Sequence, residues 1–139
     1  MIVVDEQLLG YGLPETIQKW YPGKVTDIRQ LRPGSIIKDD AVPSLLRLVR
    51  EPTFVTINVA DFWRKMRPYR NFMIACFAFL QSEAYKVSDI LKRSLAVEPF
   101  QTKKKRMGKI VHVTEHEIPY YSVESWTVEV IEWPRQRAK

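Results

Sequence analysis

Phe54-Val55-Thr56-Ile57-Asn58-Val59-Ala60-Asp61-Phe62-Trp63 is the stretch that decides how this chain folds. Its first half is a run of β-branched and aromatic residues that follows Pro52, which is the pattern of a short buried strand. A parallel strand delivers the residues after it to the carboxyl edge of the sheet, where α/β folds keep their ligands. We therefore expect Asn58 and Asp61 at that edge, at the start of a helical turn.

The N-terminus repeats this pattern. Residues 1–4 are all apolar, and Asp5 and Glu6 follow directly. A carboxylate immediately after a fully apolar strand is costly unless it lies at an exposed edge or is bound to something. Two apolar strands that each release a carboxylate at the same edge predict an acidic metal site.

Strand and helix patterns alternate through the first 97 residues, which predicts a parallel α/β sheet. The expected strands are 1–4, 25–28, 53–57 and 72–79. The expected helices are 14–21, 41–49 and 82–97, with a single helical turn at 61–66, an irregular loop at 29–38, and Ser82 or Ser88 as the cap of the last helix.

After Pro99 the composition changes. A basic loop at 101–109 precedes the segments 110–113, 120–123 and 127–131, which we expect to form two or three short antiparallel strands. The polar tail at 134–139 is expected to fray. We divide the chain into an α/β core at 1–100 and a basic loop with a small β extension at 101–139, both within one domain.

Length and composition fit one globular domain of 139 residues. The net charge of +6 mildly favours a polyanionic partner. The longest apolar run, 73–80, is too short to cross a bilayer, so no membrane partner is expected. The N-terminus lacks the positive charge of an export signal, and the single cysteine, Cys76, cannot form an intramolecular disulfide. We expect a cytoplasmic protein.

Acidic residues occupy strand ends and helix starts throughout the core. The leading candidates are Asp5, Asp40 and Asp61, with Glu6, Asp27, Asp39 and Asn58 as further members of the same pocket. Hard oxygen ligands without histidine or cysteine suit Mg²⁺ or Mn²⁺, and such a site activates water for phosphodiester hydrolysis. The alternative is that Asp39, Asp40 and Asp61 only cap helices.

Three segments together, 3–6, 38–46 and 54–62, resemble the PIN-like nuclease superfamily, in its compact branch of toxin-like and uncharacterised members. In that family a strand ends in Asp-Glu, an acidic residue opens a middle helix, and a strand ends in Thr-x-Asp-x-Asp-Phe. The likeness covers residues 1–80 and weakens toward 97. It implies a parallel sheet in a three-layer α/β domain and a Mg²⁺- or Mn²⁺-dependent ribonuclease.

Carried over by position, the resemblance makes Asp5, Asp40 and Asp61 the metal ligands, with Thr56 orienting a ligand or the attacking water. One position departs from the family pattern. Asn58 stands where members often carry an aspartate, and one extra residue separates it from Asp61. The loss of a negative charge weakens divalent binding.

Two functions follow. The first is an endoribonuclease, as the toxin of a toxin–antitoxin pair with an antitoxin protein as its partner. The second is a PIN-like module that binds RNA or protein without hydrolysis.

Two basic segments are candidates for gripping an RNA backbone, a contact that gives affinity without sequence information. The first holds Arg64, Lys65, Arg67 and Arg70, and the second holds Lys103, Lys104, Lys105, Arg106 and Lys109. Trp63 or Tyr69 is the candidate for stacking a base. The alternative for both segments is an ordinary solvated surface.

Self-association is a further hypothesis, because Tyr120, Tyr121, Trp126 and Trp133 offer aromatic surface through which strand edges of two protomers would pair. His112 and His116 lie four residues apart, but no cysteine or third histidine completes a zinc site, so a surface position is the favoured interpretation. Cys76 is expected to be a small core residue.

Overall fold

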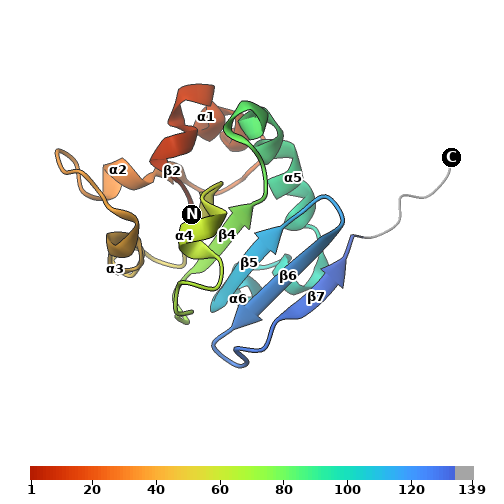
Figure 1. Ribbon diagram of the computed structural model, residues 1–139. Helices are drawn as coiled ribbons and strands as arrows, with labels where there is room; N and C mark the ends of the chain where they lie inside the picture. The colour runs from red at the N-terminus through yellow and green to blue at the C-terminus, as the bar shows by residue number, and fades with distance from the viewer. Residues whose placement is uncertain (134–139) are drawn as a thin grey trace, which may run out of the picture.

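The computed structural model describes residues 1–133, in which a single seven-stranded sheet forms the centre of the molecule (Figure 1). Strand order across the sheet is β2-β1-β3-β4-β5-β6-β7. The first five strands are parallel, and the last two are antiparallel. The strands are β1 (Ile2–Val4), β2 (Val25–Asp27), β3 (Thr53–Thr56), β4 (Met73–Phe77), β5 (Lys109–Val113), β6 (Glu117–Ser122) and β7 (Glu129–Glu132).

The three central strands are buried on both faces, as their uniformly apolar sequences require. Every residue of β1, β3 and β4 is buried. Parallel strands need cover on both faces because their crossover connections place helices there. The chain is therefore an α/β protein with a mixed, mostly parallel sheet, as the alternating pattern predicts.

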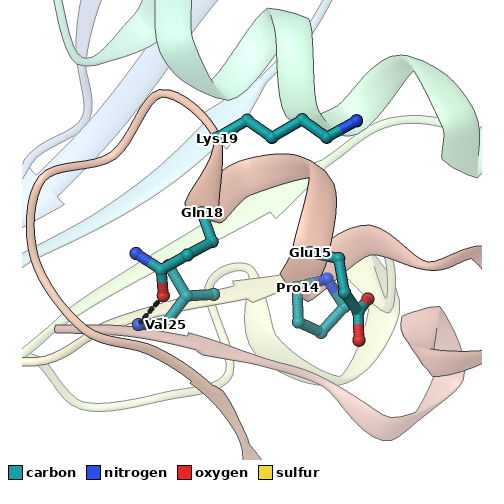
Figure 2. Close-up of a pocket in the computed structure, with 5 residues that line it drawn as sticks. All are labelled: Pro14, Glu15, Gln18, Lys19 and Val25. Atoms are coloured by element: carbon teal, nitrogen blue, oxygen red, sulfur yellow. Dashed lines mark hydrogen bonds between the residues drawn. The ribbon is translucent and has the colours of Figure 1, made fainter.

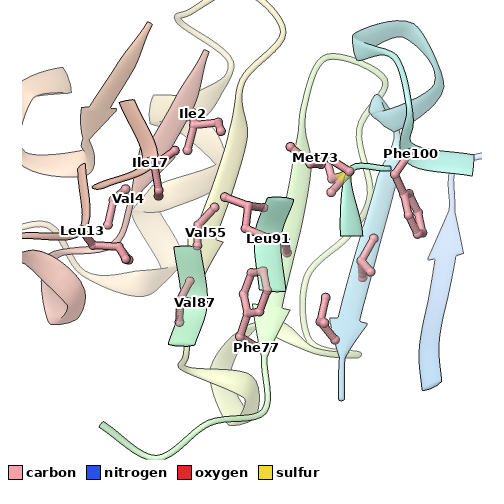
Figure 3. Packing of buried hydrophobic residues seen from close by; sticks show 14 of the residues in the cluster. Ile2, Val4, Leu13, Ile17, Val55, Met73, Phe77, Val87, Leu91 and Phe100 are labelled. Atoms are coloured by element: carbon pink, nitrogen blue, oxygen red, sulfur yellow. The ribbon is translucent and has the colours of Figure 1, made fainter. Parts of the chain in front are cut away.

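Helices pack on both faces and divide the core in two. The first core joins Ile2, Val4 and Val55 of the sheet to Ile17 of α1 and Leu91 of α5 (Figure 3). The second joins alternate sheet residues to apolar side chains of α2, α3 and α4. The helices are α1 (Leu13–Gln18), α2 (Ile28–Leu31), α3 (Val42–Leu46), α4 (Val59–Phe62), α5 (Val87–Ser94) and α6 (Lys103–Arg106), with 3₁₀ turns η1 (Glu6–Tyr11), η2 (Asp39–Ala41), η3 (Gln81–Lys86) and η4 (Glu98–Phe100).

Two features between residues 29 and 94 differ from expectation, each for a local reason. The predicted loop at 29–38 begins with the short helix α2, because Asp27 Oδ1 accepts hydrogen bonds from the backbone N–H groups of Arg29 at 2.9 Å and Gln30 at 3.3 Å. Neither predicted serine caps the long helical segment. Its first turn starts at Gln81, with Glu83 accepting from the Leu80 N–H at 3.1 Å, while Ser88 accepts from Trp20 Nε1 at 2.9 Å.

The C-terminal part is more continuous with the core than predicted. Strand β5 pairs in parallel with β4, with Cys76 opposite His112, so the expectation of an antiparallel strand there is wrong. Only β6 and β7 are antiparallel. The basic loop contains the helix α6, because Thr102 accepts a hydrogen bond from the Lys105 N–H at 3.1 Å. The tail at 134–139 lies outside the described residues.

The aromatic residues of the β extension mostly serve the core. Tyr121 is only 4% exposed, and Trp133 packs against the first core, where its Nε1 donates to the Thr114 carbonyl at 2.8 Å. Trp126 is 58% exposed. Trp126 is therefore the main exposed aromatic residue that remains to support the self-association hypothesis. Within residues 1–133 no helix has the length and apolar character needed to cross a membrane.

Candidate functional site

The strand order places a natural ligand position between β1 and β3. Strand β1 lies between β2 and β3, so the chain leaves it toward one side of the sheet and later continues on the other. In open α/β sheets the crevice outside the carboxyl ends of the strands at such a reversal is where ligands bind. Asp5 follows β1 and Thr56 ends β3 at this point.

Asp5 is held by the neighbouring strand. Its side chain is 4% exposed, and Thr56 Oγ1 donates a hydrogen bond of 2.6 Å to Asp5 Oδ2. The same hydroxyl accepts from the Asn58 backbone N–H at 2.9 Å, so it links the ends of both strands. Burial raises the pKa of Asp5, and the bond from Thr56 opposes that rise.

Asn58 joins two further carboxylates. Its Nδ2 donates to Asp39 Oδ2 at 2.6 Å and to Asp61 Oδ2 at 2.8 Å. Its Oδ1 accepts from the Asp61 backbone N–H at 3.3 Å and so caps helix α4. The cap fixes the orientation of the amide, because turning it over would lose this bond and point an oxygen at two carboxylates.

The carboxylates of this cluster repel one another. Burial, followed by the interaction with Asp61 and the charges of Asp5 and Glu6, raises the pKa of Asp39 to about 6. The hydrogen bond from Asn58 lowers the pKa of the exposed Asp61. The charged form of Asp39, the more buried carboxylate, is therefore destabilised, and a bound cation would stabilise it.

Of the residues predicted from sequence, the structure gathers Asp5, Thr56, Asn58 and Asp61 and replaces one. Asp40 is exposed, and no hydrogen bond within residues 1–133 involves its carboxylate, whereas its neighbour Asp39 reaches the cluster. Both lie in the first turn of η2, where adjacent side chains point in different directions. Glu6 is exposed and contributes its charge only, and Asp27 is occupied as the cap of α2.

We name Asp5, Asp39, Thr56, Asn58 and Asp61 the acidic cluster. In the arrangement observed, no three carboxylate, imidazole or thiol side chains of residues 1–133 enclose a position fit for a metal ion. Asp39 and Asp61 nevertheless converge on one point, the Asn58 Nδ2 atom. Mg²⁺ commonly binds one or two carboxylates and keeps several waters, so this pair of hard oxygen donors fits it in kind.

The first predicted basic segment starts at the carboxyl edge of the sheet, after α4, and ends at Arg70, which pairs with Glu124 near the amino edge, where the second segment lies. Arg64, Lys65 and Arg67 are exposed on the loop after α4, and the charge of Lys65 acts on Asp61. Helix α6 precedes β5 and so lies at the amino edge, where the charge of Lys103 acts on the N-terminal amino group of Met1. Its residues 103–105 are exposed, but they are remote from the acidic cluster.

Arg106 corrects the nucleic-acid prediction most clearly. It is 7% exposed, and its Nε donates to the Phe100 carbonyl at 2.7 Å while Nη2 donates to the Gln101 carbonyl at 3.3 Å. This side chain holds the turn η4 onto the fold, so it is unavailable for a phosphate.

The two predicted stacking residues are already packed. The Trp63 ring lies 5.1 Å from His112 and 5.3 Å from Tyr121, and the guanidinium of Arg47 lies 4.8 Å from the Tyr69 ring centre. The exposed aromatic ring beside the loop after α4 is Trp126, which the sequence pattern assigned only to self-association. The only indication of its exposure in the sequence was its position between the polar residues Ser125 and Thr127.

A pocket of about 400 Å³ lies between α1 and the outer strand β2 (Figure 2). Gln18 dominates it, with Oε1 accepting from the Val25 N–H at 3.2 Å and Nε2 donating to the Gly23 carbonyl at 2.8 Å. These bonds occupy backbone groups at the edge of the sheet that would otherwise pair with another chain. We interpret the pocket as a consequence of edge protection.

A comparison with protein-family models finds no match for this chain, and comparisons with curated proteins and with solved structures find none either. We therefore infer the function from the geometry of the acidic cluster and its surroundings.

Proposed function

We propose that this protein is a PIN-like, Mg²⁺- or Mn²⁺-dependent endoribonuclease whose acidic cluster hydrolyses RNA phosphodiesters. The observation that carries the proposal is that Thr56 and Asn58 link Asp5 to the pair Asp39 and Asp61 at the strand-order reversal. Carboxylates from three separate chain segments are joined there in one hydrogen-bonded network. An assembly of like charges is electrostatically costly and is characteristic of sites that bind something positive.

The ion would be held by Asp39 and Asp61, which already share one position, and water would complete its coordination. When bound, it supplies a Lewis acid and an activated water for attack on phosphorus. Asp5, fixed by Thr56, lies beside them as a buried carboxylate able to orient that water. Asn58 must give up one or both of its bonds to the carboxylates for the ion to enter.

The test is RNA cleavage with Mg²⁺ or Mn²⁺ by the wild type and by single Asp→Asn variants. We expect Asp39→Asn and Asp61→Asn to lose at least about tenfold in rate, because each removes a charged ligand. Asp89→Asn on α5 makes the same charge change at an exposed position far along the chain, and serves as the matched control. Equal rates for all four proteins would refute the assignment of the site.

A second function is favoured by one observation, the double hydrogen bond from Asn58 to Asp39 and Asp61. A neutral amide satisfies both carboxylates and thereby reduces their need for an ion. On this alternative, the domain binds RNA or protein without hydrolysing it. Calorimetry with Mg²⁺ and Mn²⁺ separates the two functions, since saturable binding that Asp61→Asn abolishes supports the nuclease, and its absence supports the binding module.

A further inference from the structure

A second pocket, of about 220 Å³, lies where the loop after α4 meets the β6–β7 connection. It is lined by Arg64, Lys65, Met66, Arg67, Tyr121 and Trp126. Tyr121 forms a rigid part of the wall, because its hydroxyl donates to the Met66 carbonyl at 2.6 Å and its ring packs on Trp63. Trp126, at 58% exposure, stands on the other side of the pocket with most of its surface free.

The three cations of this pocket form no salt bridge with a carboxylate within residues 1–133. The Arg64 guanidinium lies 5.8 Å from the Tyr121 ring centre and that of Arg67 lies 5.6 Å from the Tyr69 ring centre, so both are oriented by aromatic rings. Arg70, a few residues further on, is paired with Glu124 at 3.3 Å. Unpaired cations grouped beside a free aromatic ring are the combination that binds single-stranded nucleic acids.

The pocket is also next to the acidic cluster along the chain. Asp61 belongs to α4, and the segment with Arg64, Lys65 and Arg67 starts directly after Trp63, the C-cap of that helix. The charge of Lys65 acts on the Asp61 carboxylate. An RNA strand with one phosphate at the acidic cluster would therefore pass over Lys65 toward the pocket.

We propose that this pocket binds a nucleotide of single-stranded RNA that flanks the cleaved phosphate, with its base stacked on Trp126 and its phosphates on Arg64, Lys65 and Arg67. The inference rests on the proposed function for the identity of the strand. The pocket would hold the strand through stacking and charge, and both interactions tolerate any base, so it adds affinity and register without sequence preference.

RNA fits this surface better than an acidic protein segment does. Carboxylate side chains would pair with the cations but leave Trp126 without a planar partner, whereas every nucleobase has a π-face. Duplex RNA hides its base faces within the helix and would use only the cations. The exposed ring of Trp126 therefore distinguishes these three ligands.

The experiment measures binding of a fluorescently labelled, mixed-sequence single-stranded RNA by anisotropy, in EDTA so that no hydrolysis occurs. We expect Trp126→Ala to weaken binding about tenfold and Trp126→Phe to retain most of the affinity. Lys65→Gln should reduce the slope of log K against log salt concentration by about 0.7, the value for one lost contact to a single strand.

Lys104→Gln is the matched control for charge. It removes one exposed lysine from α6 and should leave the salt slope unchanged. Helix α6 is attached to Phe100 of the first core through Arg106, whereas Tyr121 and Met66 of the pocket belong to the second core. A duplex of the same sequence is the control for stacking, because its affinity should not respond to Trp126→Ala. Circular dichroism of each variant checks folding, and the exposure of Trp126 predicts no change.

Equal RNA affinity for the wild type and Trp126→Ala would overturn the proposal, as would equal effects of Lys65→Gln and Lys104→Gln. Competition by polyglutamate as strong as by RNA would also overturn it, in favour of an acidic protein ligand. Because binding is measured without metal, the result is independent of catalysis. RNA cleavage without a Trp126 effect would refute only this pocket, and a Trp126 effect without cleavage would refute only the nuclease.

Discussion

The two edges of the parallel sheet use charge in opposite ways. At the carboxyl edge, carboxylates from three segments are drawn together around Thr56 and Asn58, two neutral side chains that bond to them. At the amino edge, α6 presents three lysines to solvent and turns its one arginine inward onto backbone carbonyls. At the carboxyl edge, the clustered negative charges repel one another and raise the pKa of Asp39. At the amino edge, the positive charges of residues 103–105 are exposed to solvent.

The difference between the two edges shows that a run of like charges in the sequence is weak evidence for function. Lys103 to Arg106 is the most basic run of the chain, yet it lies far from the acidic cluster and one of its members stabilises the fold. The acidic residues are scattered over 57 positions from Asp5 to Asp61 and meet only after folding. Variants at the two edges test this difference, and we expect the greatest effect from Thr56.

Thr56→Val should be the most destabilising change. It removes the donor to the buried Asp5 carboxylate and the acceptor for the Asn58 N–H while keeping the side-chain shape. Leaving a buried carboxylate without its partner costs about 3 kcal/mol in free energy of unfolding. Urea denaturation measures the loss. Thr56→Ser keeps the hydroxyl and should lose much less, and equal losses for the two variants would show that the hydroxyl is unimportant.

Arg106→Met should reduce stability by about 2 kcal/mol, since two backbone carbonyls lose a charged donor. Lys104→Met on the same helix should change the free energy of unfolding by less than about 0.5 kcal/mol, as is usual for an exposed site. Chemical denaturation of the pair tests the division of roles within α6. Similar values for both would mean that Arg106 is no more structural than its neighbours.

Asn58→Asp tests the carboxyl edge directly. In EDTA it should cost about 1 kcal/mol, because the donor to Asp39 and Asp61 becomes a further negative charge. Millimolar Mg²⁺ or Mn²⁺ should restore the thermal midpoint of the variant more than that of the wild type, because ligand binding stabilises the folded state by mass action. A midpoint unaffected by either ion would argue against any cation site in the acidic cluster.

Asp39→Asn and Asp40→Asn should separate the structural assignment from the sequence-based one. Asp39 bonds to Asn58, whereas Asp40 is exposed, so divalent binding by calorimetry should weaken much more in the first variant. The expected difference is at least about tenfold in affinity. The reverse order would restore Asp40 to the position that the family resemblance assigned to it.

The smallest expected effect is a pH dependence from His112. Burial lowers its pKa below the ordinary 6.5, and its Nε2 is enclosed without a hydrogen-bond partner beside Trp63, Cys76 and Tyr121, with only a weak opposing influence from Glu117. The unfolded chain therefore takes up the proton first, and the histidine should make unfolding easier as pH falls below about 6.5.

Asp39 and Asp5 act in the opposite sense over a lower range, since the pKa of Asp39 is raised to about 6 and that of Asp5 is also raised. Comparing the wild type with His112→Gln isolates the histidine. The difference in free energy of unfolding between the two proteins should shift in favour of the variant between pH 7 and 5. A difference that is constant with pH would show that His112 titrates normally.

Much of the fold could be predicted from the sequence because its signals are local. Apolar runs bounded by proline, glycine and acidic residues fixed β1, β3 and β4, and their alternation with helical patterns gave the parallel order. The direction of β5 could not be predicted, because Ile110 to Val113 has the composition of either kind of strand and its direction depends on pairing with β4. The short helices α2 and α6 depend on single capping bonds from Asp27 and Thr102, which sequence patterns indicate weakly.

The emergence of carboxylates at one edge of a parallel sheet follows from local sequence alone, because the residues after parallel buried strands leave the sheet at the same edge. Only the tertiary structure decided that Asp39 joins them in place of Asp40, that Asn58 bridges two carboxylates, and that Trp126 stands beside Arg64 and Lys65. These contacts join segments that are distant in the chain. The orientation of the turn η2 decides whether Asp39 or Asp40 reaches Asn58, and the course of the β6–β7 connection decides where Trp126 lies. Local propensity fixes where a strand ends, but packing fixes which side chains meet there.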